Sequence, residues 1–134
     1  MKKNRIAILA FLMVLAISAL ACEFSASTAN IASAKLSADE TGSPTTTVFT
    51  ADQTFYCVVT LANAPDDTTL KAVWTAVDVE GEEPNTAIGE KELTGGGNPY
   101  VFNASVDGSW PIGTYKVDLY LNDKLDRTLE FEVQ

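Results

Sequence analysis

Two cysteines and several clustered carboxylates are the side chains with the most distinctive chemistry in this 134-residue chain, which contains no histidine. A catalytic cysteine needs a base, usually histidine, and a metal site needs several soft or imidazole ligands. The sequence offers Cys57 neither kind of partner. We therefore predict that Cys57 is a buried thiol that packs as a small apolar side chain. No catalytic residue, metal ligand or cofactor is predicted.

Carboxylates gather in one stretch of six residues, which contains Asp78, Glu80, Glu82 and Glu83. Calcium binds about six to eight oxygen ligands, and paired carboxylates can hydrolyse glycosides, so both functions are alternatives for this stretch. It lacks EF-hand spacing, and a small chain with short loops offers little cleft for a sugar. We predict a solvated acidic loop and, with histidine absent, a protein that is not an enzyme.

The first 21 residues predict an export signal. Lys2, Lys3 and Arg5 form a basic start, and residues 6–21 are apolar except for Ser18. This run of 16 residues is shorter than the ~20 that a membrane-spanning helix needs. We predict a signal helix over residues 1–21, and the alternative is an uncleaved membrane anchor.

Residues 18–22 read Ser-Ala-Leu-Ala-Cys, which resembles the lipobox of bacterial lipoproteins. The resemblance implies that Cys22 receives a diacylglyceryl group and becomes the new N-terminus. The family usually has leucine three positions before the cysteine, where Ala19 stands here. The same residues suit ordinary signal peptidase, so free secretion is an alternative, and only an unlipidated Cys22 could form a disulfide with Cys57. Residues 22–30 are mostly small and polar and predict a flexible tether.

Loss of the signal makes the chain strongly acidic. The whole chain has 9 basic and 18 acidic residues, and residues 1–21 hold three of the basic ones and no acid, which leaves 6 and 18 and a net charge of −12. Such a surface repels nucleic acid and anionic lipid headgroups. We expect attachment to the membrane through the lipid on Cys22 alone, no nucleic-acid partner, and a basic protein as any further partner.

Alternation of apolar and polar residues, broken by Gly, Pro, Asn and Asp clusters, predicts an all-β domain over residues 31–134. Trp74, Tyr115, Val117, Leu119 and Phe131 are predicted to lie in its core. Short strands with such turns are typical of a seven-stranded antiparallel sandwich. The expected strands are 31–37, 54–62, 69–79, 86–93, 99–106, 114–121 and 125–133, the fourth at a sheet edge because it is mostly polar.

Gly113 to Val117, followed by a hairpin, is similar to the end of immunoglobulin-like and fibronectin type III domains. The resemblance implies an immunoglobulin-like sandwich in which the Tyr115 hydroxyl bonds to the backbone at a corner. It also places Cys57 and Trp74 in the core. Val117 stands where antibody domains have their second cysteine, so the resemblance implies no disulfide between the sheets.

The usual topology of that family separates the loops into two ends. Residues 63–68, 95–98 and 122–124 are expected at the end where the tether enters, facing the membrane. The opposite end is expected to carry Asp39 and Glu40, the acidic loop 80–85, and residues 107–112 with Trp110. We predict that a partner docks at this outward end, and the residues assigned to that site are Glu80, Glu82, Glu83 and Trp110. The alternative for Trp110 is that it closes the end of the core.

The function expected from these features is a lipid-anchored binding or structural module on the extracytoplasmic side of the cell membrane, without catalytic activity. The alternative is a small protease inhibitor or ligand carrier on the same scaffold. An inhibitor would present a loop to its protease, and the proline-containing loop 63–67 is the candidate.

Overall fold

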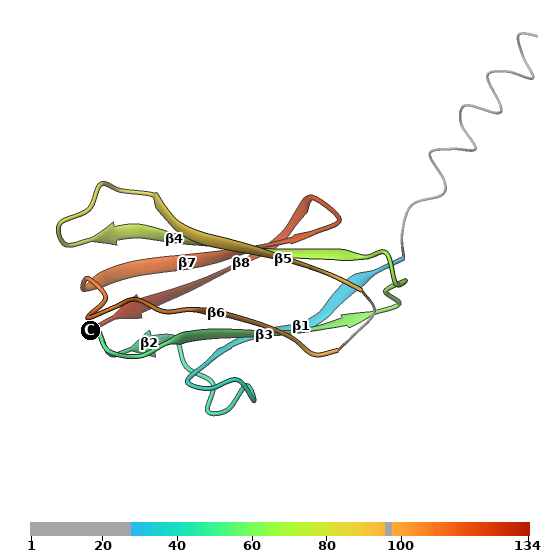
Figure 1. The fold of residues 1–134 in the computed structure, drawn as a ribbon, viewed down its shortest axis with the longest axis horizontal. Helices are drawn as coiled ribbons and strands as arrows, with labels where there is room; N and C mark the ends of the chain where they lie inside the picture. The colour runs from blue at the N-terminus through green and yellow to red at the C-terminus, as the bar shows by residue number, and fades with distance from the viewer. Residues whose placement is uncertain (1–27, 96–97) are drawn as a thin grey trace, which may run out of the picture.

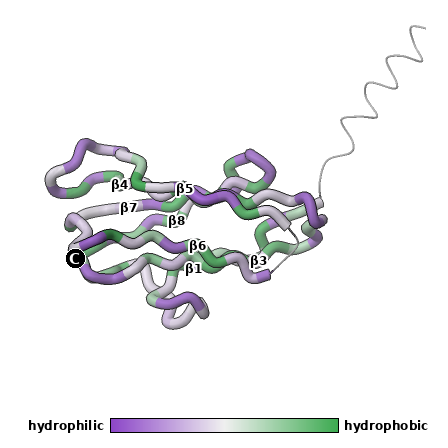
Figure 2. Tube along the Cα trace, in the orientation of Figure 1, coloured by the Kyte–Doolittle hydropathy of each residue, from purple (hydrophilic) through white to green (hydrophobic). Residues whose placement is uncertain are grey.

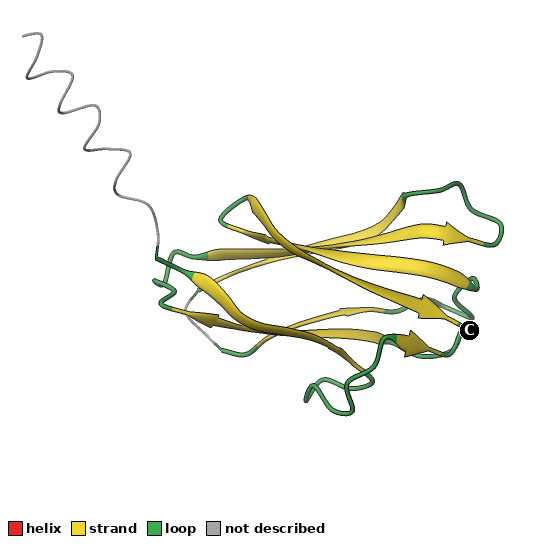
Figure 3. Cartoon of the chain, turned by 180° about the vertical axis from the view of Figure 1, so that it is seen from behind, coloured by secondary structure: helices red, strands yellow, loops and turns green. Residues whose placement is uncertain are grey.

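The computed structural model describes residues 28–95 and 98–134, and within them every regular element is a β-strand. The strands form two sheets that pack face to face as a sandwich (Figures 1 and 3). The predicted signal helix over residues 1–21 and the lipidation site Cys22 lie outside the described residues. The part of the chain that is described contains no helix long and apolar enough to cross a membrane.

The two sheets differ in size. The three-stranded sheet has the order β1-β3-β6, and the five-stranded sheet has the order β2-β8-β7-β4-β5. The smaller sheet contains β1 (Asn30–Ser37), β3 (Phe55–Ala62) and β6 (Tyr100–Ala104), and the larger one contains β2 (Val48–Phe49), β4 (Thr69–Val79), β5 (Thr86–Thr94), β7 (Gly113–Leu121) and β8 (Lys124–Val133).

The all-β prediction is confirmed, but the count of seven antiparallel strands is wrong. Each expected strand is present with ends within two residues of the prediction, and β5 lies at a sheet edge as its polar sequence indicated. The eighth strand is β2, which pairs in parallel with the end of β8 and makes the larger sheet mixed. A strand of two residues is too short to show alternation, so the sequence carried no signal for it. β1 begins at Asn30, the last residue assigned to the predicted tether.

The core between the sheets is built around aromatic rings. Phe55 is fully buried, and its ring packs against five others at centroid distances from 4.5 to 6.2 Å. Those five rings belong to Phe49, Trp74, Trp110, Tyr115 and Phe131. The predicted core residues Trp74, Tyr115, Val117, Leu119 and Phe131 are all buried. Along the strands, apolar and polar residues alternate, whereas the loop between β4 and β5 is hydrophilic (Figure 2).

One corner of the sandwich is fixed by a side-chain bond. The Tyr115 hydroxyl donates to the Pro111 carbonyl at 2.5 Å, the arrangement that the sequence resemblance implied. Gly113 enters β7 just before it, at φ +149°. A Cβ there would collide with the Asp78 carbonyl oxygen on β4, so the close approach of the two strands requires glycine.

Candidate functional site

The described chain begins at one end of the sandwich, together with three loops (Figure 1). The Thr28 hydroxyl donates to the Asn63 carbonyl at 3.4 Å. The Gly95 amide donates to the Thr68 carbonyl at 3.2 Å, and the Asn122 amide donates to the carbonyl of the next residue along, Thr69, at 2.9 Å. The predicted grouping of loops 63–68, 95–98 and 122–124 is therefore confirmed for its described residues.

The opposite end carries the acidic loop. Residues 80–85 join β4 to β5, and the Glu80 amide donates to the Ile112 carbonyl at 3.0 Å, which ties the start of this loop to the residue before β7. Glu80, Glu82 and Glu83 are all exposed. Ile112 and Val106 beside them are 47% and 44% exposed, among the most exposed large apolar side chains described. This end therefore combines a carboxylate rim with apolar side chains in solvent.

Trp110 does not present an exposed ring at this end, in contrast to its assignment as a docking residue. It is only 8% exposed, and its ring stacks on Phe55 with the centroids 4.5 Å apart. Its indole Nε1–H donates to the Gln53 carbonyl at 2.9 Å. The alternative interpretation is the right one, because a large ring with a satisfied N–H gains more by closing the core than by standing in water.

Asp39 and Glu40 do not lie at the end that carries the acidic loop, which corrects a second expectation. Their turn folds back beside the three-stranded sheet (Figure 1), with the Ala38 amide donating to the Pro44 carbonyl at 3.1 Å. Asp39 accepts the hydroxyl and the amide of Thr41, and these bonds lower the pKa of its carboxyl. An antiparallel bridge between Ser37 and Thr45 brings the chain back to the end of β1 before it enters β2 in the other sheet.

A cavity of about 290 Å³ opens at the end with the acidic loop, between the larger sheet and residues 105–111. Its walls are mainly apolar, and Glu82 and Trp110 both contribute to them. Burial raises the pKa of Tyr115 in this wall, and the charge of Glu82 raises it further. A pocket with apolar walls and a carboxylate suits the end of a cationic side chain with an apolar stem.

The structure describes one of the two cysteines, Cys57. Cys57 is fully buried and unpaired, and burial raises the pKa of its thiol to about 12, so it is an unreactive core residue as predicted. Cys22 lies outside the described residues. Over residues 28–95 and 98–134, no three Cys, Asp or Glu side chains come together in a way that could hold a metal ion.

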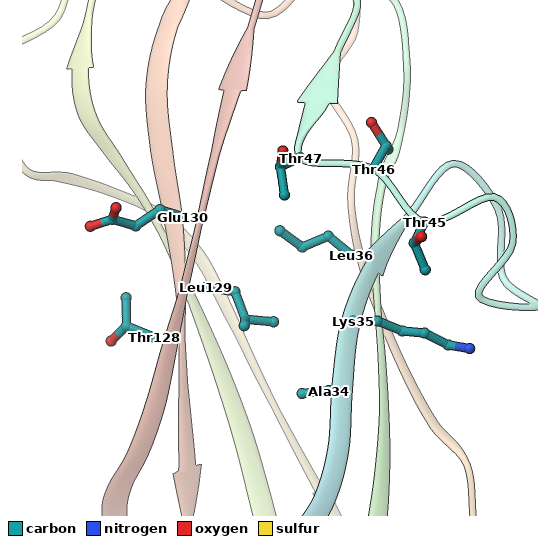
Figure 4. Close-up of a pocket in the computed structure, with 9 residues that line it drawn as sticks. All are labelled: Ala34, Lys35, Leu36, Thr45, Thr46, Thr47, Thr128, Leu129 and Glu130. Atoms are coloured by element: carbon teal, nitrogen blue, oxygen red, sulfur yellow. The ribbon is translucent and has the colours of Figure 1, made fainter.

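A second surface, which the sequence did not reveal, is a groove of about 630 Å³ between β1 and β8 (Figure 4). Ala34 and Leu36 of β1 face Leu129 of β8 across it. Residues 45–47 close one end. The groove forms between strands that are about ninety residues apart in the chain, so no local pattern could have indicated it.

The similarities of this chain to known proteins lie in the fold. No protein-family model and no curated protein sequence matches the chain. Among solved structures, it is similar to the alkylpurine DNA glycosylase AlkC of Pseudomonas fluorescens bound to DNA containing an abasic site analogue, with a TM-score of 0.51, 15% identity, and coverage of 79% of this chain and 30% of that one. It is also similar to a β-glucosidase of Listeria innocua in complex with laminaribiose, with a TM-score of 0.51, 13% identity, and coverage of 80% and 16%.

These similarities contradict the expectation that the protein is not an enzyme, because both solved proteins are enzymes. The chain spans less than a third of the length of either. At these identities the likeness shows a shared fold, and neither the DNA of the one nor the sugar of the other is carried over to this chain.

Proposed function

We propose that the protein is a lipid-anchored binding module of the bacterial cell envelope, held to the membrane through Cys22 and facing the extracytoplasmic side. The basic start, the short apolar run and the lipobox-like residues 18–22 support the anchor. The acidic composition supports a domain that stands away from anionic headgroups.

We further propose that the domain is an immunoglobulin-like sandwich related to fibronectin type III domains. Its connectivity supports this, because β1, β3 and β6 form one sheet while β4, β5, β7 and β8 lie in the other. The bond from the Tyr115 hydroxyl to the Pro111 carbonyl supports it as well.

The observation that carries the proposed function is the placement of the acidic loop at the far end from the start of the described chain (Figure 1). A domain anchored by its N-terminus presents that far end outward. Glu80, Glu82 and Glu83 are exposed on one loop beside exposed Val106 and Ile112, so carboxylates border an apolar patch. An apolar centre with a polar rim is the usual anatomy of a protein interface, and the sign of the rim selects a basic protein.

The alternative of a protease inhibitor is less well supported. The candidate loop 63–67 lies at the end where the described chain begins, since the Asn63 carbonyl accepts the Thr28 hydroxyl. In an anchored protein that loop would face the membrane and not a protease.

Two experiments test the proposed function, one for the anchor and one for the docking end. Cys22→Ala is expected to release the domain into the soluble fraction or to leave the precursor uncleaved, and normal cleavage with unchanged membrane attachment would contradict the anchor. For docking, envelope proteins captured by the wild type are compared with those captured by a variant that carries glutamine at 80, 82 and 83. We expect a salt-sensitive basic partner to be lost from this variant.

The matched control for docking carries asparagine at 66 and 67, two exposed carboxylates at the other end. Loss of the partner from this control, with retention by the glutamine variant, would contradict the proposed orientation.

A further inference from the structure

The groove between β1 and β8 exposes a strand edge. At one end of it, the Thr46 amide donates to the Leu36 carbonyl at 3.0 Å, and the Glu132 amide donates to the Thr47 carbonyl at 2.9 Å. Further along, the Arg127 guanidinium donates to the Ile31 carbonyl at 2.9 Å, which joins β8 to β1 again. Between these two closures, β8 pairs with β7 on one side and with no described residue on the other.

The backbone groups along this edge point into the groove. Glu132 and Gln134 donate their amides away from β7, to the carbonyls of Thr47 and Phe49. The backbone groups of successive residues in a strand point to opposite sides. Thr128 and Glu130 lie four and two residues before Glu132, so their N–H and C=O groups also point away from β7. No described residue bonds to them. The edge therefore offers two donors and two acceptors in line with β2.

The side chains around the edge define what could pair there. Leu129 faces Leu36 and Ala34 across the groove, whereas Thr128 and Glu130 point to the outer face of the larger sheet (Figure 4). An added strand would place every second side chain against this apolar floor. Its other side chains would lie next to Thr128 and Glu130, where an opposite charge stabilises a cross-strand pair with Glu130 and a like charge destabilises it.

Charge also disfavours a second copy of this chain as the occupant. Two β8 edges that met antiparallel would bring carboxylate to carboxylate, in a chain with a net charge of −9 before any processing. We propose that the free edge of β8 at Thr128 and Glu130 accepts an extended segment of a basic partner protein, in which cationic side chains alternate with small apolar ones. The segment adds a strand to the larger sheet and continues the line of β2, at a surface separate from the acidic end.

The test uses the full-length protein in zwitterionic detergent and a synthetic peptide of about seven residues, the length of a short strand, in which lysine alternates with valine. A second peptide has glutamate in place of lysine, and a third has the lysine sequence with alternate amides methylated so that it cannot pair. Amide hydrogen exchange is measured residue by residue. At a peptide concentration about ten times the Kd, the lysine peptide is expected to slow exchange at Thr128 and Glu130 by ~10-fold, and the other two peptides are expected to have no effect.

Matched charge variants locate the binding. Glu130→Lys is expected to abolish the protection, whereas Glu92→Lys, an exposed change on the opposite edge strand β5, is expected to keep it. Protection by the glutamate peptide, protection that survives Glu130→Lys, or protection confined to residues 80–85 would each overturn the proposal. Slow exchange at Thr128 and Glu130 without peptide would also overturn it, by showing that the chain itself or a second copy covers the edge.

Discussion

Truncation of Phe55 is the sharpest test of the aromatic core. Its ring is fully buried and touches five other aromatic rings. Replacement of a buried phenylalanine by alanine costs about 3–5 kcal/mol, because transfer energy is lost and a cavity remains. Aromatic pairs add roughly 0.5–1.5 kcal/mol each beyond their buried area. We therefore expect Phe55→Ala to reach the upper part of that range, about 4–5 kcal/mol, which is most of the stability of a small domain.

The assay is urea unfolding followed by tryptophan fluorescence, which reports on Trp110 because its ring stacks on Phe55. The matched control is Tyr56→Ala, which removes a half-buried ring from the other face of the same strand and is expected to cost about 1 kcal/mol. Phe55→Leu keeps much of the volume and is expected to cost about 1–2 kcal/mol, so the comparison survives even if the alanine variant does not fold. An equal cost for Phe55→Ala and Tyr56→Ala would refute the central role of this ring.

Three further predictions concern the corner of the sandwich and the buried thiol. Tyr115→Phe should cost about 1–3 kcal/mol of stability and lower the Tm in thermal unfolding, since it leaves the Pro111 carbonyl without its donor. An unshifted Tm would show that the bond does not stabilise the fold. Gly113→Ala should cost about 2 kcal/mol or more in the same assay, because of its positive φ and its approach to the Asp78 carbonyl. Cys57 should resist thiol reagents until the protein unfolds. As pH rises, the Cys57 thiol loses its proton in the unfolded protein, near pH 9.0, before it does so in the folded protein, near about 12. The free energy of unfolding therefore does not depend on this thiol below pH 9.0 and decreases between pH 9.0 and about 12. Cys57→Ala should remove the part of this decrease that comes from the thiol.

Much of the fold could be predicted from local pattern because its strands are long enough to alternate. In β4, Leu70, Ala72, Trp74 and Ala76 share one parity in the sequence and are all buried in the structure. The separation of the acidic loop from loops 63–68, 95–98 and 122–124 was also predictable, because strand order determines which loops meet. The turn with Asp39 and Glu40 was expected beside the acidic loop and does not lie there (Figure 1). β2 could not be predicted, since its two residues form a strand only where β8 offers them a partner.

The candidate sites were harder to predict for a different reason. The sequence allowed Trp110 either to point outward or to close the core, and the choice depends on Phe55, a contact partner 55 residues earlier in the chain. The edge of β8 was visible as an alternating strand, but its unpaired state depends on where residues 45–47 cross between the sheets. Both outcomes are set by packing between distant segments, which local periodicity does not record.

The two ends of the described chain lie at opposite ends of the sandwich (Figure 1), and this determines how the domain bears mechanical force. A pull between Thr28 and Gln134 runs along the strands, while the hydrogen bonds between strands run across them. The bonds from the amides of Glu132 and Gln134 to the segment around β2, like the ladder between β1 and β3, are therefore loaded together in shear. Hydrogen bonds loaded in shear break together and not one after another. The force needed to separate the chain ends is therefore that of a whole ladder of bonds and not that of a single bond.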